Sequence, residues 1–129
     1  MVGVEVVTVA ITGRRRATVG AWGEAQAAVF LERMGWQILE RNWRCAVGEI
    51  DLVAREPDGT VVLVEVKTRS GLGYGSPLEA ITYAKQSKLR ELVHWWRREH
   101  RGAGPLRVDA VGVLRERGGV QITHVRGAL

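Results

Sequence analysis

The spacing of apolar and polar residues along the chain predicts two amphipathic helices. The first runs from about Thr18, which suits an N-cap, to Met34, and Gly35 follows as a stop signal. The second covers about 82–100 and ends before Gly102. Each helix carries an apolar stripe, so we expect each to pack one face against a sheet.

Runs rich in β-branched and aliphatic residues predict strands between and after these helices. They lie at 36–43, 48–55, 60–68, 106–114 and 119–125. The glycine-rich segment 69–77 is predicted to be a loop. The order α-β-β-β-α-β-β predicts an α/β fold with a mixed sheet flanked by helices. Residues 1–12 form a β-prone arm that either pairs with a sheet edge or stays loose, and residues 13–129 are predicted to be one domain.

The segment between the second and third predicted strands has the chemistry of a tight hairpin turn. Pro57 suits the first central position of a type I turn, and Gly59 suits the left-handed position of a three-residue loop. This turn places Glu56 opposite Thr60 and thereby sets the register of the hairpin.

Counting back from the turn brings four charged residues onto one face of the hairpin. Asp51 is predicted to face Glu65, and Glu49 to face Lys67. Two opposed carboxylates among apolar neighbours need a cation, a shared proton or a positive side chain. A divalent cation with oxygen ligands meets this need, with Lys67 as a nearby charge. The alternative, a solvated face of Glu–Lys pairs, leaves the Asp51–Glu65 repulsion unrelieved.

One acid lies on the apolar stripe of the first predicted helix. Glu24 is the only charge on this stripe, whose other members are Ala27, Ala28, Leu31 and Met34. A carboxylate on a core-facing stripe needs a partner, which would place Glu24 near the hairpin acids. The alternative is that its negative charge simply favours the start of the helix.

Lysines near the start of the second predicted helix have two interpretations. Lys85 shares a face with Leu89, Leu92 and Trp96, whereas Lys88 lies off that face. Lys85 therefore either points inward near the predicted site or lies along the helix flank with its ammonium group in water.

Composition narrows the protein classes further. The chain has 129 residues, of which 46% are hydrophobic and 26% charged, and this is typical of one soluble globular domain. The net charge of +5 favours a polyanionic partner, either nucleic acid or an anionic membrane face, over a merely solvated cationic surface. Arginine supplies 16 of the 19 basic residues. No apolar run is long enough to span a membrane. A single cysteine, Cys45, excludes an internal disulfide and leads us to expect a cytoplasmic protein.

Three segments taken together resemble a known protein family. They are Gly23-Glu24 opening a helix, GEIDLVA at 48–54 and VEVKTR at 64–69. Further segments around them agree: ERNWR at 40–44, GSPLEA at 75–80 and RVD at 107–109. In order and spacing, the chain resembles the YraN-like family of uncharacterised bacterial proteins over about residues 13–126. That family is similar to the restriction-endonuclease-like PD-(D/E)xK superfamily, and archaeal Holliday-junction resolvases are among its relatives there.

The resemblance implies a restriction-endonuclease-like fold and an endonuclease site that hydrolyses phosphodiester bonds. Asp51 matches the first acid of the superfamily pattern, Glu65 the second and Lys67 the lysine. Glu24 matches the helix acid of the resolvase-like branch. The proline that usually precedes the first acid is absent, because Ile50 occupies that position.

The resemblance also implies a cofactor and a role for each site residue. Mg²⁺ or Mn²⁺ would be held by Asp51, Glu65 and the backbone carbonyl of Val66, with Glu24 binding directly or through water. Lys67 would orient or deprotonate the attacking water. Lysine suits this task, whereas arginine cannot give up its proton.

The expected partner is nucleic acid, and DNA is favoured over RNA. Candidate phosphate contacts are Arg41, Arg44, Arg69 and Lys85. We expect recognition of backbone or shape, as with branched DNA, because no base-reading pattern is present. Two alternatives stay open: a non-catalytic nucleic-acid-binding module on the same fold, and an interaction domain that forms a homodimer through Trp95 and Trp96.

Overall fold

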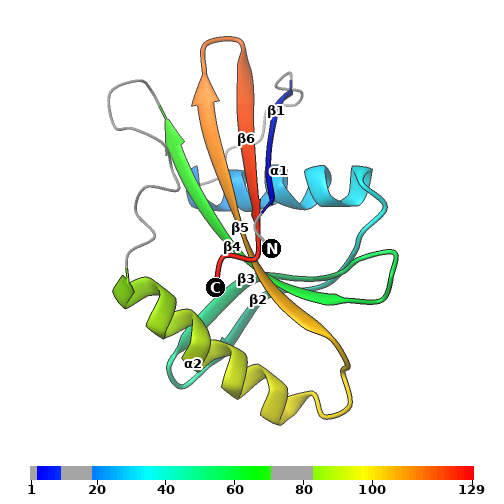
Figure 1. The fold of residues 1–129 in the computed structure, drawn as a ribbon. Helices are drawn as coiled ribbons and strands as arrows, with labels where there is room; N and C mark the ends of the chain where they lie inside the picture. The colour runs from blue at the N-terminus through cyan, green and yellow to red at the C-terminus, as the bar shows by residue number, and fades with distance from the viewer. Residues whose placement is uncertain (1–2, 10–18, 71–82) are drawn as a thin grey trace.

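A six-stranded mixed sheet with one helix on each face forms the protein (Figure 1). The computed structural model describes residues 3–9, 19–70 and 83–129. The strands lie in the order β1-β6-β5-β4-β3-β2, and β4 and β5 form the parallel pair. The elements are β1 (Gly3–Val9), α1 (Val19–Arg33), β2 (Gln37–Cys45), β3 (Gly48–Arg55), β4 (Val61–Ser70), α2 (Tyr83–Glu99), β5 (Leu106–Glu116) and β6 (Gly119–Arg126).

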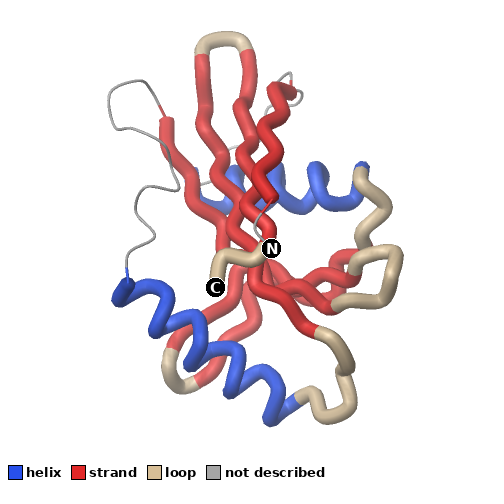
Figure 2. Tube along the Cα trace, in the orientation of Figure 1, coloured by secondary structure: helices blue, strands red, loops and turns tan. Residues whose placement is uncertain are grey.

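The predicted α/β class and the predicted element order are confirmed (Figure 2). Of the two alternatives for the N-terminal arm, β1 pairs antiparallel with β6 at one edge of the sheet. The predicted loop starts too early, because Arg69 and Ser70 extend β4 along β5. The rest of that loop and the predicted cap at Thr18 lie outside the described residues.

Local chemistry ends the first helix and closes the central hairpin as predicted. Gly35 has a φ of 86°, and its N–H donates to Glu32 while that of Trp36 donates to Leu31, which is a Schellman motif. In the hairpin, the Glu56 N–H donates to the Thr60 carbonyl at 2.9 Å, and the loop glycine has a φ of 95°. The predicted turn and its register are therefore confirmed at this end of the hairpin.

Two apolar clusters hold the helices on opposite faces of the sheet. α1 packs through Ala27, Ala28 and Leu31 against one face of the sheet, to which β5 and β6 contribute apolar side chains. α2 packs on the other face through Leu89, Leu92 and Trp96. Side chains alternate along β4, so its odd-numbered residues from 61 to 67 face α2. Among the described residues, neither helix is both long and apolar enough to cross a membrane.

A buried polar network joins β5, β6 and the residue that follows β6. Asp109 is fully buried and accepts hydrogen bonds from Arg107 Nε at 2.7 Å, His124 Nε2 at 2.8 Å and the Gly127 N–H at 3.0 Å. Arg107 also donates to Glu56 beside the hairpin turn. Burial raises the pKa of Asp109, but these hydrogen bonds outweigh it and leave the pKa below its ordinary value.

Candidate active site

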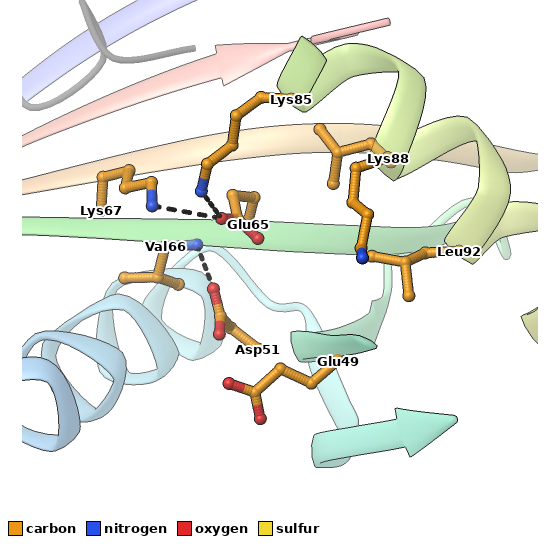
Figure 3. Close-up of a pocket in the computed structure, with 9 residues that line it drawn as sticks. Glu49, Asp51, Glu65, Val66, Lys67, Lys85, Lys88 and Leu92 are labelled. Atoms are coloured by element: carbon orange, nitrogen blue, oxygen red, sulfur yellow. Dashed lines mark hydrogen bonds and ion pairs between the residues drawn. The ribbon is translucent and has the colours of Figure 1, made fainter. Parts of the chain in front are cut away.

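The strands β3 and β4 separate at the point where the predicted acids lie. They pair antiparallel only as far as Leu52 and Val64. If the alternating hydrogen bonds of the ladder continued, the Val66 N–H would donate to Ile50. It donates instead to Asp51 Oδ2 at 2.7 Å (Figure 3). The Asp51 side chain therefore takes the place of the next backbone hydrogen bond, and the two strands fork around it.

The fork corrects one part of the predicted register and leaves the other intact. The sequence placed Asp51 directly opposite Glu65 and Glu49 opposite Lys67, but neither pair belongs to the ladder of the hairpin. Glu49 instead pairs with Arg44 of β2, with Arg44 Nε 3.3 Å from Oε2. The shared face is correct, because all four predicted residues line one cavity.

This cavity lies between β3, β4 and α2 and has a volume of about 400 Å³. Carboxylates come from both forked strands, and lysines come from β4 and α2 (Figure 3). Two leucines of α2 close its apolar side. The lining residues are Glu49, Asp51, Glu65, Val66, Lys67, Lys85, Lys88, Leu89 and Leu92.

Two lysines contact the same oxygen of Glu65. Lys67 Nζ lies 3.6 Å and Lys85 Nζ 3.3 Å from Oε1. The Glu65 side chain is 13% exposed, so these ammonium groups offset a largely desolvated charge. Of the two interpretations of Lys85, the inward one is therefore what the structure shows.

The environment of Asp51 disfavours its charged form. Burial, followed by the negative charge of Glu65, raises the pKa of Asp51 to about 7 from an ordinary 3.8. The Val66 N–H opposes this rise, while Glu24 and Glu49 add to it. Asp51 thus lies in the field of three other carboxylates, and a cation would favour its ionised form.

The two ammonium groups at Glu65 differ in acidity. The neighbouring Lys85 and partial burial lower the pKa of Lys67, although Glu65 opposes them. Contact with Lys67 and the charge of Glu65 raise the pKa of Lys85 against the effect of burial. Two ammonium groups side by side at one carboxylate disfavour each other's charge, so one lysine of this pair loses a proton more readily than an isolated lysine would.

A close approach of α1 to β4 positions Glu24. Gly23 is buried, and a Cβ atom at this position would lie 1.8 Å from Thr68 Oγ1. Only a glycine allows this contact, and Glu24 follows it as a half-buried residue near enough to Asp51 to raise its pKa. Glu24 does not line the cavity, so of the four predicted site residues it is the one that lies behind the cavity wall.

The donor set can be compared with the needs of a metal ion. Among the described residues, no three His, Cys, Asp or Glu side chains form a group that could hold one. Mg²⁺, however, is usually bound by one or two carboxylates and keeps several waters. Asp51 and Glu65 supply two carboxylates here, and the Val66 carbonyl points to the same side of β4 as its N–H. This set fits a hydrated Mg²⁺ or Mn²⁺ ion and does not form a closed protein cage.

Most of the predicted phosphate contacts lie outside the cavity. Arg41 Nη2 is 3.9 Å from Glu32 Oε1, and Arg44 pairs with Glu49. Arg69 donates to the carbonyl of Thr68 at 3.1 Å. Lys85 is the one member of the predicted set that lines the cavity.

Sequence reasoning missed Lys88, which also lines the cavity. Its position off the apolar stripe of α2 gave no reason to place it there. A signal was available in the composition: the chain has three lysines, Lys67, Lys85 and Lys88, and all three line this cavity.

The tryptophan pair of α2 does not form a joint dimer surface. Trp96 is 2% exposed, stacks on His100 with ring centroids 4.0 Å apart, and donates from Nε1 to Glu40 at 3.4 Å. Trp95 is half-buried under the guanidinium group of Arg98. The idea of a contact made by both rings is therefore wrong, because Trp96 belongs to the core.

Comparison with known proteins agrees with the motifs in the sequence. A protein of Clavibacter michiganensis subsp. michiganensis, called UPF0102 protein, is 56% identical over 106 residues, which cover 81% of this chain and 89% of that protein. A UPF0102 protein of Beutenbergia cavernae is 48% identical over 116 residues, covering 88% and 98%. A solved structure titled "Structure of EndoMS-dsDNA2 complex" matches with 20% identity and a TM-score of 0.40, and the match covers 81% of this chain and 39% of that one. The profile described as "Uncharacterised protein family UPF0102" matches residues 23–113, and the chain belongs to this family, the YraN-like family that its motifs resembled.

Proposed function

We propose that this protein is a divalent-metal-dependent nuclease of the PD-(D/E)xK kind that hydrolyses phosphodiester bonds of DNA. One observation carries the proposal. The fork between β3 and β4 brings the buried Asp51 and the partly buried Glu65 to one cavity, with the Lys67 ammonium group beside them. Two acids and a lysine that line one cavity are the groups that metal-assisted hydrolysis needs.

The proposed ion is Mg²⁺ or Mn²⁺, held by Asp51, Glu65 and the Val66 carbonyl, with Glu24 contributing through water. When bound, the ion would lower the pKa of a water molecule and neutralise charge on the scissile phosphate. The Val66 N–H donates a hydrogen bond to Oδ2 of Asp51, and both lysines contact Oε1 of Glu65. The second oxygen of each carboxylate is therefore the one we assign to the ion.

Each lysine at Glu65 has its own role in the proposal. Lys67 orients the attacking water or, once it has released its own proton to solvent, accepts one from it as the neutral amine that its lowered pKa favours; its Nζ lies at the acids. Lys85 stays charged, because its pKa is raised, and it offsets negative charge that develops on the phosphate.

DNA is the proposed substrate because the cavity is open, polar and bordered by ammonium groups on a protein of net charge +5. None of the cavity-lining side chains forms an Asn, Gln or Arg pattern that reads base edges. We therefore propose structure-dependent cleavage, as at branched DNA, and not sequence-specific cleavage.

The test is cleavage of a labelled four-way DNA junction and of a linear duplex with the same arms, in Mg²⁺, in Mn²⁺ and in EDTA. We expect metal-dependent cleavage that Asp51→Ala and Lys67→Ala each reduce by at least about 100-fold. Arg90→Ala is the matched control, since Arg90 is exposed on α2 and does not line the cavity. Cleavage that survives both site variants would refute the assignment. DNA binding without cleavage, unchanged in Asp51→Asn, would instead identify a non-catalytic binding module.

A further inference from the structure

Lys88 stands apart from the other two lysines of the cavity. Lys67 and Lys85 both contact Glu65, whereas Lys88 makes no ion pair with a carboxylate of the described part of the chain. Its residue is exposed, yet its ammonium group lines the cavity together with Glu49 and Leu92 (Figure 3). Its positive charge therefore faces the cavity without a carboxylate partner among the described residues.

The position of this ammonium group is built into the fold. A Cβ atom on Gly48 would lie 3.2 Å from Lys88 Cε and 3.8 Å from its Nζ, so the lysine stem lies directly over the glycine backbone. Gly48 begins β3 with a φ of 150°, which also favours glycine over other residues. Contact with the backbone restricts the stem, so less side-chain entropy is lost when the ammonium group binds an anion.

The choice of lysine at this position is itself unusual for the chain. Other exposed cations of α2 are arginines, as at Arg90, Arg97 and Arg98. A compact ammonium group on a straight stem fits over Gly48, and it interacts with a phosphate as a point charge. An arginine would carry the same charge, so the fit of the lysine stem over Gly48 is what distinguishes this position from its arginine neighbours.

The charge balance of the cavity indicates the chemical class of the ligand. Three carboxylates and three ammonium groups line it, so their formal charges cancel. A divalent cation would make this lining net positive, which favours an anionic ligand such as the phosphodiester backbone of a strand. The metal site accounts for one phosphate, and Lys88 is the remaining cation on the cavity wall that is not bound to Glu65.

We propose that Lys88, held over Gly48, binds the backbone phosphate next to the scissile one and so sets where the DNA strand lies across the cavity. The inference rests on the proposed function, and it adds a binding residue that neither motif matching nor the metal site requires. Lys88 is a positioning residue, because it contacts a phosphate that does not react.

Binding can be measured apart from cleavage with a fluorescein-labelled four-way DNA junction in Ca²⁺, by anisotropy over a series of salt concentrations. Lys88→Ala should lower the slope of log affinity against log salt by about 0.9, which corresponds to roughly eight-fold weaker binding at 0.1 M salt. Lys88→Arg should keep the wild-type slope, because it keeps the charge. Arg90→Ala is the matched control on the same helix, and circular dichroism checks that each variant is folded.

The outcomes separate this inference from the proposed function. Metal-dependent cleavage by the wild type, with a Lys88→Ala variant of unchanged affinity and slope, would overturn the inference alone. An equal loss in Arg90→Ala would also overturn it, because the effect would then belong to the charge of the whole helix. A wild type that neither binds nor cleaves the junction would overturn both.

Discussion

Replacement of Asp51 by asparagine separates what the residue costs the fold from what it does in the site. The asparagine side chain would keep nearly the same shape, and its amide oxygen can still accept the hydrogen bond that the Val66 N–H donates at 2.7 Å to the carboxylate. The variant removes the charge that burial and Glu65 disfavour. In the absence of metal ions, Asp51→Asn should therefore stabilise the protein at neutral and alkaline pH.

The expected size and pH range follow from the pKa of Asp51. The rise from 3.8 to about 7 corresponds to about 4 kcal/mol, because one pKa unit is worth about 1.4 kcal/mol. The folded state holds this proton more tightly than the unfolded state, so wild-type stability falls as pH rises from about 4 to about 7 and is level above that. The asparagine variant lacks this dependence. Since an amide accepts a hydrogen bond less strongly than a carboxylate, we expect a net gain of about 1–4 kcal/mol at pH 8.

Urea unfolding in EDTA at pH 4 and at pH 8, followed by circular dichroism, tests this expectation. The stability difference between Asp51→Asn and wild type should be near zero at pH 4 and favour the variant at pH 8. Saturating Mn²⁺ should stabilise only the wild type, by about 2.7 kcal/mol at 100 times the dissociation constant. A variant that is less stable than wild type at pH 8, or a stability difference that is the same at both pH values, would show that the pKa of Asp51 is not raised in the folded state.

Three further predictions test the packing, the polar network and the proposed base. Gly23→Ala should destabilise the protein by about 1–3 kcal/mol, because the new Cβ would lie 1.8 Å from Thr68 Oγ1. The control is Gly20→Ala on the same helix, whose Cβ meets nothing within 4 Å and which should stabilise the protein by up to about 1 kcal/mol. Thermal unfolding compares the two variants. Asp109→Asn should lower the free energy of unfolding by about 3–5 kcal/mol at pH 7. The difference from wild type should shrink below about pH 4, because the pKa of Asp109 is lowered in the folded state and its stabilising effect is lost as pH falls toward that pKa; urea unfolding between pH 7 and pH 3 measures it. Lys67→Arg should keep Mn²⁺ binding, measured by calorimetry, but lose at least about 100-fold in DNA cleavage, because arginine does not release its proton.

The fold was predictable because each element carries local signals that agree with its burial. Gly35 ends α1 in a Schellman motif, and the Glu56–Thr60 turn sets the hairpin register, both from short-range chemistry. The edge pairing of β1 with β6 was left open, because an alternating segment does not specify its partner strand. The strand extension through Ser70 depends on pairing with β5, which is a contact between distant parts of the chain.

The residues of the candidate site that lie on strands were predictable from the sequence, whereas those on the helices were less so. Alternation placed Asp51, Glu65 and Lys67 on one face, because strand geometry repeats every two residues. The fork was not predictable, because it requires a side chain to replace a backbone partner of the ladder. Lys88 was missed for a related reason: helical spacing gives the direction of its Cα–Cβ bond, whereas its ammonium group is placed by a four-carbon stem over Gly48.

The fork makes the register of the hairpin and the chemistry of the site inseparable. Where two strands separate, backbone N–H groups lose their hydrogen-bond acceptors. An acidic side chain at the branch point can serve as the acceptor, as Asp51 does for the Val66 N–H. The same separation ends the ladder pairing of the Val66 carbonyl with β3, on the side of β4 where its N–H meets Asp51, so one branch point provides both a carboxylate and a backbone oxygen. A register shifted by one residue would put an apolar side chain, Ile50 or Leu52, at this point and leave the N–H buried and unpaired. The tight turn at Pro57–Gly59 therefore acts on the site from the far end of the hairpin, because it determines which residue of β3 meets Val66.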